Sequence, residues 1–213
     1  MLPILVILHG WNQSSSNWVM IKQILEKDFS VIAFDLPGFG IEPLKNKNWA
    51  IPDYANWVIS KLEDIQGDKV ILGHSFGGRI ASYIASNEPE WLKGLILYGA
   101  PCLYRPSLKI RVKIFLAKLS KILNLKRLLI TNNTELIDAD NSGLGKIFRN
   151  AVSFDQTGIL PQINVPTLLI WGEYDSAVPL RIAEEMQTLI PKGTLSIIDQ
   201  VGHNVHQENP YLF

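Results

Sequence analysis

Residues 69–86 read KVILGHSFGGRIASYIAS and join an apolar run, a glycine-rich turn and a helix-like run. The bare pattern G-x-S-x-G is a weak signal, but its position between a strand and a helix strengthens it. A serine on such a sharp turn needs neighbours without a Cβ atom, because strand and helix pass closely there, and Gly73 and Gly77 meet that need. The new helix also directs N–H groups at Ser75, which favours negative charge beside it. We interpret Ser75 as a nucleophile, against the alternative of an incidental serine in a turn.

Similar apolar runs recur on both sides of this segment, each followed closely by Gly, Asp or Pro. They are ILVILHG (4–10), SVIAFDLPG (30–38), GLILYGAP (94–101), TLLIWGEYD (167–175) and LSIIDQVGH (195–203). Continuous apolar strands are typical of a parallel sheet that is covered on both faces. Amphipathic stretches lie between them, near 17–27, 52–65, 77–87 and 180–190. The alternation predicts an α/β fold, doubly wound around a mostly parallel sheet.

Composition limits the class of protein further. The 213 residues are 47% apolar, and 20 Lys and Arg balance 20 Asp and Glu, which argues against disorder and against a nucleic-acid partner. Cys102 is the only cysteine, so a disulfide framework is excluded. The apolar run 2–8 is short and follows no basic residue, so we expect no secretory leader and no membrane span. A cytoplasmic location is the expectation.

One interval is too long for a simple crossover. About sixty residues separate GLILYGAP from TLLIWG, and we predict that 102–160 form a helical cap inserted in a core made of 1–101 and 161–213. Within the cap, 105–127 hold eight basic and no acidic residues, with apolar residues at helical spacing. This basic segment is interpreted as the solvated outer face of a lid, or as a weak contact with anionic membrane surfaces or acidic substrates.

A serine hydroxyl requires a base and an acid to become a nucleophile. Asp175 closes the strand TLLIWGEYD, and His203 follows the strand that begins at Leu195. Both therefore lie beyond the carboxyl ends of their strands, where open α/β sheets place their active sites. The chain order Ser75, Asp175, His203 is also the order of a known hydrolase arrangement.

These motifs together resemble the α/β-hydrolase family, in particular its small, capped bacterial serine hydrolases and esterases. The matching segments, in the family's order, are His9-Gly10-Trp11, residues 35–40 (DLPGFG), residues 73–78 (GHSFGG), residues 171–175 (WGEYD) and Gly202-His203. The resemblance implies Ser75 as nucleophile, His203 as base and Asp175 as acid. It also implies an oxyanion hole formed by the backbone N–H groups of Trp11 and Phe76. The sequence begins where the family has a hairpin before the first strand and stops at 210–213, where the family has a final helix. Either this is a naturally trimmed version or one end is missing, and we expect the lack of that helix to expose apolar sheet surface.

Other residues admit competing interpretations. Asp35 also ends a strand, but it is more simply part of a turn that shapes the pocket floor, and Glu173 is expected to point elsewhere. His9 and His74 are expected to organise loops by hydrogen bonding. Cys102 is expected to be a buried apolar filler.

A metal site is conceivable only at His203, His206 and Glu208, yet the chain offers only four histidines and no second cluster. We therefore predict no metal and no cofactor.

The predicted function is a serine hydrolase that cleaves carboxylic esters, or lactones, of small to medium apolar substrates through an acyl-enzyme on Ser75. Trp11, Phe39 and Phe76 are candidates for substrate binding, with core packing as the alternative. Hydrolysis of carbon–carbon bonds and amino-terminal peptidase activity are alternatives within the same resemblance. A non-catalytic protein that binds a small molecule is the alternative from another class.

Overall fold

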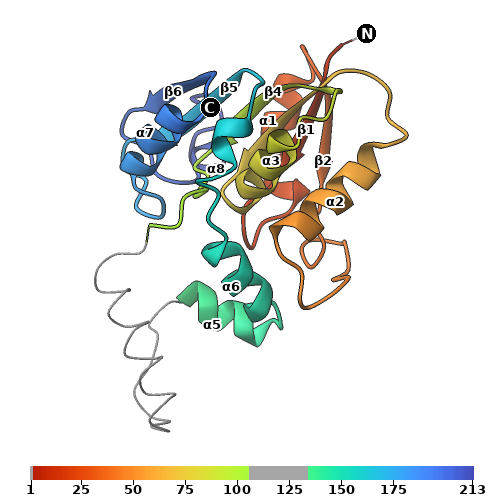
Figure 1. The fold of residues 1–213 in the computed structure, drawn as a ribbon, viewed down its shortest axis with the longest axis vertical. Coiled ribbons are helices and arrows are strands. Elements are labelled where there is room, and N and C mark those ends of the chain that lie inside the picture. The colour runs from red at the N-terminus through yellow and green to blue at the C-terminus, as the bar shows by residue number, and fades with distance from the viewer. Residues whose placement is uncertain (1, 106–133) are drawn as a thin grey trace, which may run out of the picture.

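The computed structural model describes residues 2–105 and 134–213, which form one six-stranded sheet with helices on both faces (Figure 1). The strand order is β2-β1-β3-β4-β5-β6, and every neighbouring pair is parallel. The strands are β1 (Ile4–Leu8), β2 (Ser30–Phe34), β3 (Lys69–His74), β4 (Leu92–Tyr98), β5 (Thr167–Gly172) and β6 (Gly193–Ile198). The prediction of an α/β fold with a parallel sheet is confirmed.

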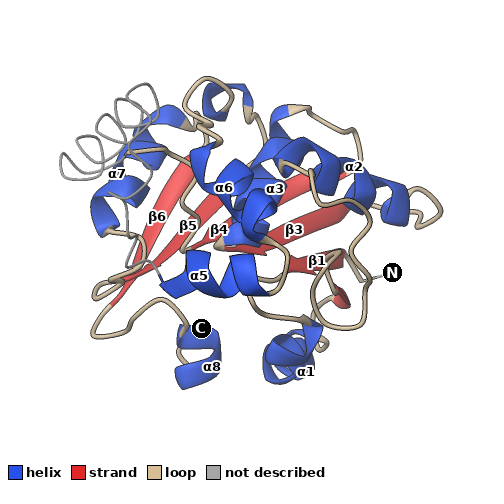
Figure 2. Cartoon of the chain, turned by 90° about the horizontal axis from the view of Figure 1, so that it is seen from below, coloured by secondary structure: helices blue, strands red, loops and turns tan. Residues whose placement is uncertain are grey.

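Two layers of helices cover this sheet, as Figure 2 shows. The α-helices are α1 (Val19–Leu25), α2 (Ile51–Leu62), α3 (Phe76–Ser86), α5 (Thr134–Asn141), α6 (Gly145–Ser153), α7 (Leu180–Leu189) and α8 (Val205–Glu208). Short 3-10 turns occur at Ser15–Trp18 and Leu160–Gln162. Helices α2, α3 and α7 pack on one face, and α1 and α8 pack on the other. The helical stretches predicted near 17–27, 52–65, 77–87 and 180–190 are confirmed within a few residues.

The alternation of side chains along each strand divides the core between these two faces. In β1, Val6 and Leu8 belong to the larger cluster beneath α2 and α3, whereas Leu5 and Ile7 belong to the smaller one beneath α1. All four are buried, because successive side chains of a strand point to opposite faces. This double burial explains why the strands are continuous apolar runs in the sequence.

Helix α2 illustrates how the sequence sets the bounds of one element. Its buried residues Ile51, Tyr54, Ala55, Val58 and Leu62 recur at helical spacing and face the core. A proline lies in the first turn, and the Asp53 carboxylate accepts a hydrogen bond from the Ala50 N–H at 2.8 Å. Start signals and an apolar stripe therefore agree on where the helix begins and which face it buries.

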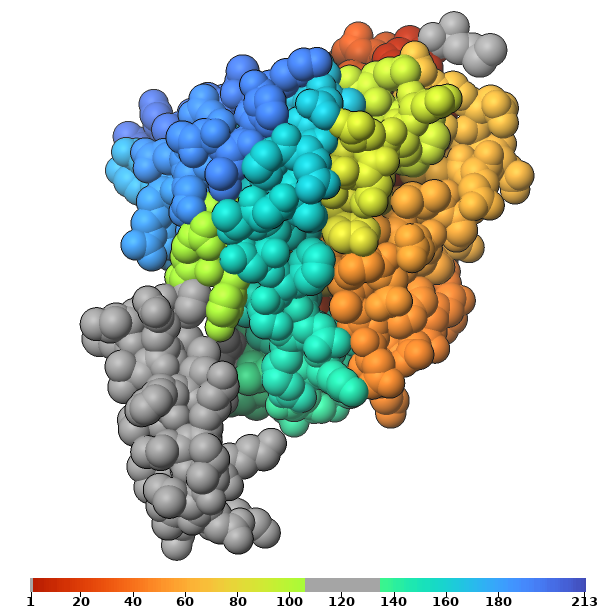
Figure 3. All heavy atoms as spheres, in the orientation of Figure 1, coloured from red at the N-terminus to blue at the C-terminus, as the bar shows by residue number. Residues whose placement is uncertain are grey.

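Helices α5 and α6 lie in the interval between β4 and β5 and stand apart from the two layers (Figure 1). In Figure 3 the residues of α6 lie against the region that precedes α2, and the Asn150 amide donates hydrogen bonds to the carbonyls of Asn48 and Trp49. At the base of the interval, the Gln156 N–H donates to the Cys102 carbonyl at 3.0 Å. A cap insertion is consistent with this placement, and its boundaries, 102–160, remain a prediction.

Apart from Arg105, the predicted basic segment 105–127 lies outside the described residues. Within the parts of the chain that the structure describes, no helix has the length and hydropathy needed to cross a bilayer.

Candidate active site

The turn between β3 and α3 holds Ser75 in a strained conformation. Its φ of 50° and ψ of −110° lie in a region that residues with a side chain rarely adopt. A Cβ atom at Gly73 would lie 2.6 Å from the Gly77 carbonyl oxygen, and one at Gly77 would overlap the Leu8 carbonyl. The two glycines therefore permit the tight passage from strand to helix. The Ser75 N–H donates to the Tyr98 carbonyl at 2.9 Å, which ties the turn to the neighbouring strand.

Two backbone N–H groups near Ser75 have no acceptor among the residues that the structure describes. Phe76 is the first residue of α3, so its N–H has no partner within the helix, and the Trp11 N–H makes no hydrogen bond to any described residue. The Gly77 N–H donates to the His9 carbonyl at 3.1 Å and holds the loop of Trp11 against the start of α3. The Phe76 donor at the helix N-terminus and the Trp11 donor on the adjoining loop suit a developing oxyanion.

Asp175 and His203 are in direct contact. The His203 Nδ1 atom lies 2.7 Å from Asp175 Oδ2, and the Asp175 side chain is 1% exposed. The other carboxylate oxygen, Oδ1, accepts hydrogen bonds from the N–H groups of Ala177 at 2.9 Å and Val178 at 2.7 Å. These amides fix the carboxylate, so His203 presents a proton on Nδ1 to it and leaves Nε2 able to accept one.

The backbone of His203 is held from two sides. Its carbonyl accepts a hydrogen bond from the Tyr98 hydroxyl at 2.6 Å and lies 3.1 Å from His74 Nε2. The same hydroxyl accepts from the Val205 N–H at 2.6 Å. Tyr98 ends β4 and His74 ends β3, so the loop of His203 is fastened to the centre of the sheet.

Gln13 links the loop of Trp11 to the loop of His203. Its Oε1 accepts from the Gly10 N–H at 3.0 Å and lies 3.2 Å from His74 Nδ1. Its Nε2 donates to the Asn204 side chain at 3.1 Å. The loop that offers the Trp11 N–H and the loop that carries His203 are therefore joined through one side chain.

A cavity of about 240 Å³ lies where these loops meet. Ser75 and His203 both line it, and no hydrogen bond joins their side chains within the described residues. Most of the other residues that line the cavity are apolar. They come from α6 and from α3 and the loops at the edge of the sheet. The other lining residues are Trp11, Phe76, Arg79, Pro101, Glu135, Phe148, Ala151, Val152, Ala177 and Val178.

The predicted substrate-binding aromatics divide into two groups. Trp11 and Phe76 line the cavity, with ring centroids 5.3 Å apart. Phe39 packs edge-on against Trp11 at 5.0 Å but is not among the lining residues, so it supports the pocket from behind. Phe148 of α6 lies 5.0 Å from Trp11 and lines the cavity instead.

Asp35 and His9 organise neighbouring loops. The Asp35 carboxylate accepts from the N–H groups of Ser15 at 2.6 Å and Ile41 at 2.9 Å. Burial acts to raise the pKa of Asp35, but these amide bonds outweigh it and the pKa lies below its ordinary value. His9 Nε2 accepts from the Leu36 N–H at 3.0 Å, so the ring is neutral, and burial lowers its pKa. Both residues therefore have the loop-shaping contacts expected of them.

The remaining candidates lie outside the cavity lining. Glu173 is exposed and accepts from the Gln200 N–H. The His206 ring stacks on Trp18, with centroids 4.2 Å apart. Cys102 is fully buried, and burial raises the pKa of its thiol to about 11. In the described ranges, no three His, Cys, Asp or Glu side chains gather as metal ligands would.

Sequence reasoning missed Tyr98, Gln13, Arg79 and Phe148. Tyr98 reads as a strand residue and Arg79 as an ordinary charged residue of a helix, and their roles depend on contacts with segments far away in the chain. Gln13 stands in a polar loop without a motif. Only the proximity of Gln13 to the His9-Gly10-Trp11 segment offered a signal.

Comparison with known proteins identifies the family. The family model described as "alpha/beta hydrolase fold" matches residues 3–135 and 131–210, so the chain belongs to the α/β-hydrolase family. The expected family membership is confirmed.

Three similar proteins illustrate the relationship. An uncharacterized hydrolase, YugF of Bacillus subtilis, is 30% identical over 236 residues, covering 98% of this chain and 86% of the relative. A pimeloyl-[acyl-carrier protein] methyl ester esterase of Wigglesworthia glossinidia brevipalpis is 30% identical over 244 residues, with 98% and 90% coverage. The structure of an esterase from Exiguobacterium antarcticum superposes with a TM-score of 0.78 at 22% identity, covering 98% of this chain and 87% of that one. The sequence relatives support an ester hydrolase at a general level, and the structural neighbour shows the fold.

Proposed function

We propose that this protein is a serine hydrolase that cleaves carboxylic esters, or lactones, of small to medium apolar substrates through an acyl-enzyme on Ser75. The observation that carries the proposal is the 2.7 Å contact between His203 and a buried Asp175, beside the cavity that Ser75 lines. A carboxylate that fixes a neutral imidazole beside a serine is the arrangement that activates a hydroxyl.

In the first half of the reaction, Ser75 Oγ attacks the ester carbonyl carbon while His203 Nε2 accepts the hydroxyl proton. The carbonyl oxygen becomes an oxyanion, which the N–H groups of Trp11 and Phe76 stabilise. Collapse of this intermediate breaks the carbon–oxygen bond to the alcohol, and His203 returns the proton to the leaving oxygen. An acyl ester on Ser75 remains.

In the second half, a water molecule attacks the acyl carbon and His203 accepts its proton. A second oxyanion forms at the same N–H groups. Its collapse breaks the bond between the acyl carbon and Ser75 Oγ, His203 returns its proton to Oγ, and the acid is released. Asp175 stays ionised throughout and stabilises the imidazolium that forms twice.

The choice of substrate class rests on the cavity and on the relatives. A volume of about 240 Å³ and the rings of Trp11, Phe76 and Phe148 favour acyl groups of modest size. One named relative acts on a methyl ester, and ester cleavage needs no group beyond those described. Contact of the basic segment 105–127 with anionic surfaces stays a separate proposal.

Hydrolysis of p-nitrophenyl esters from acetate to palmitate tests the proposal. We expect turnover to peak at a short or medium chain and to vanish in Ser75→Ala. Ser60→Ala, at an exposed site on α2, is the matched control and keeps full activity. A folded wild-type protein that shows no turnover, and whose Ser75 a fluorophosphonate does not label, would overturn the proposal in favour of a non-catalytic binding protein.

A further inference from the structure

Arg79 is a buried charge that the proposed reaction does not use. It lies on α3, four residues after Ser75, and only 5% of its surface is exposed. One guanidinium nitrogen donates to the Phe154 carbonyl at 2.9 Å. A guanidinium has five N–H donors, and no carboxylate of a described residue lies within ion-pair distance of this one.

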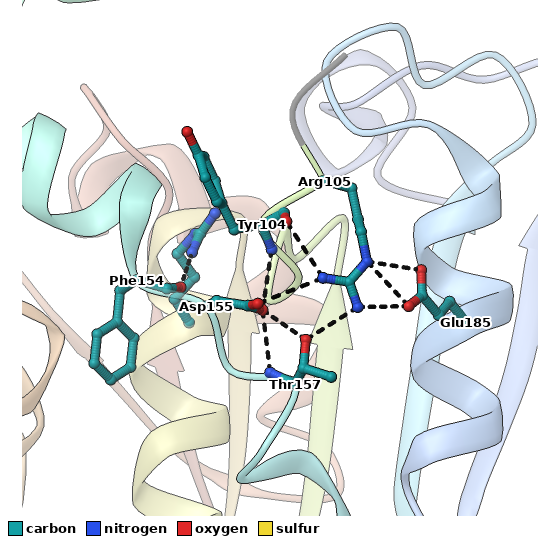
Figure 4. Close-up of polar contacts among 7 residues, drawn as sticks. Tyr104, Arg105, Phe154, Asp155, Thr157 and Glu185 are labelled. Atoms are coloured by element: carbon teal, nitrogen blue, oxygen red, sulfur yellow. Dashed lines mark hydrogen bonds and ion pairs between the residues drawn. The ribbon is translucent and has the colours of Figure 1, made fainter. Parts of the chain in front are cut away.

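The nearby acidic residues are bound to a different arginine, as Figure 4 shows. Asp155 accepts from Thr157 through Oδ1 and contacts Arg105 through Oδ2. The Glu185 carboxylate, on α7, accepts hydrogen bonds from two nitrogens of Arg105, and the shorter of these bonds is 2.6 Å. Arg105 therefore takes the direct contacts of both carboxylates, and Arg79 is left without an ion pair of its own, although Asp155 acts on its charge at longer range.

Arg79 also lines the cavity that Ser75 and His203 share. Glu135, the other charged lining residue, lies on α5 and is exposed, whereas Arg79 is deep in the structure. The cavity thus combines mostly apolar walls with one buried cation and one acidic residue at its outer side.

A buried cation is costly unless an anion pairs with it. Because a guanidinium is planar and can donate two parallel hydrogen bonds, the anion that it matches best is a carboxylate. An anionic group on a bound ligand would pair with Arg79 and gain strength from the low dielectric of the cavity.

We propose that the substrate is an ester that carries a free carboxylate, and that Arg79 binds this carboxylate while Ser75 attacks the ester carbonyl. The inference rests on the proposed function, because it names the substrate class of the same cavity. Arg79 is accordingly a specificity-determining residue, and the distance between the two carbonyl groups of the substrate sets which chain length is preferred.

The test compares charged and neutral esters of equal length. Monomethyl esters of dicarboxylic acids, from succinate to suberate, place the carboxylate on the acyl side, and acetyl esters of hydroxy acids place it on the alcohol side. Methyl and acetyl esters without the carboxylate are the neutral partners. The readout is the ratio of kcat/KM for the charged ester to kcat/KM for its neutral partner.

We expect the wild-type ratio to exceed one in one of the two series and to peak at one length. Arg79→Met should lower that ratio by about 10- to 100-fold, the loss expected for a buried hydrogen-bonded charge pair. Arg79→Lys should retain part of the preference for the charged ester. Arg149→Met, which removes an exposed arginine of α6 paired with Asp140, is the matched control and should leave the ratio unchanged.

Binding supplies a readout that does not depend on turnover. In Ser75→Ala, free glutarate and adipate should raise the melting temperature and give a calorimetric signal, and both effects should disappear when Arg79→Met is added. Arg79→Gln, which keeps a donor for the Phe154 carbonyl, repeats the comparison if Arg79→Met unfolds.

The outcomes separate the two proposals. Dicarboxylates that bind through Arg79 without any Ser75-dependent turnover would support the carboxylate-binding role of Arg79 and defeat the proposed function. Ser75-dependent hydrolysis with a charged-to-neutral ratio that Arg79→Met does not change would do the opposite. A loss of stability alone in the Arg79 variants would mean that the residue only fastens Phe154 to α3.

Discussion

The hydroxyl of Tyr98 donates a hydrogen bond to the carbonyl of His203 at 2.6 Å and accepts one from the N–H of Val205 at the same distance. A side chain at the end of a central strand thereby replaces the backbone partners that the loop of His203 lacks. Because Tyr98 contacts the backbone and not the imidazole, it is a positioning residue. The phenol of Tyr98, buried in the core, therefore acts together with Asp175 and His74 in orienting the proposed base.

Replacing Tyr98 by Phe should reduce kcat about 10-fold and leave KM nearly unchanged. Loss of the hydroxyl leaves the His203 carbonyl and the Val205 N–H with fewer partners, which costs about 1–3 kcal/mol of unfolding free energy. Tyr211→Phe, at an exposed site, is the control. Steady-state kinetics and urea unfolding measure the two effects, and a kcat equal to that of wild type would contradict the positioning role.

Asp175→Asn and Asp35→Asn distinguish the two candidate acids. The first should lower kcat about 10³- to 10⁴-fold, because an amide favours the wrong tautomer of His203. The second should lower stability but keep kcat within about 10-fold, since Asp35 bonds to neighbouring loop residues and does not line the cavity. Turnover of one p-nitrophenyl ester by both purified variants shows which carboxylate acts as the acid. A larger loss of kcat in the Asp35 variant would reverse the assignment.

Arg105→Met should loosen the base of the interval that carries α5 and α6. The side chain of Arg105 is 31% exposed and that of Glu185 is 40% exposed, so solvent screens the pair, and the bidentate network contributes about 1 kcal/mol. A double-mutant cycle with Glu185→Gln, followed by thermal unfolding, measures that coupling. Arg149→Met breaks a more exposed pair and should change stability by less than about 0.5 kcal/mol. Equal effects at both sites would show that Arg105 has no special role.

Acid should destabilise the protein below pH 6.5. Burial, with a smaller contribution from His203, lowers the pKa of His206 from 6.5 to about 3. The unfolded chain therefore binds a proton on this imidazole more tightly than the folded protein does. The stability that neutral His206 contributes is complete above pH 6.5 and is lost as the pH falls toward 3.

His206→Phe keeps the stacking on Trp18 and removes this titration. Between pH 6.5 and 5, wild type should lose about 2 kcal/mol more than the variant, and urea unfolding at each pH measures the difference. The same loss in both proteins would assign the acid sensitivity to the other buried histidines, His9 and His74.

The sequence was sufficient to predict the sheet, the turn at Ser75 and the neighbourhood of Asp175 and His203. Apolar runs and glycine spacing are local properties, and parallel strands bring their carboxyl ends to one edge. Tyr98, Gln13 and Arg79 could not be predicted, because each acquires its role from a partner more than sixty positions away in the chain or from a cavity shared with distant segments.

The bond between the Gln156 N–H and the Cys102 carbonyl brings the two ends of the α5–α6 interval to one point of the core. Because its two ends meet, the interval connects β4 and β5 in the way that a short loop would, whatever the number of residues between them. The intervening residues can therefore vary in number without altering the register between β4 and β5, as long as the apolar face of α6 that packs on the core is kept. The proposed reacting groups would then serve new substrate preferences without any change of their own.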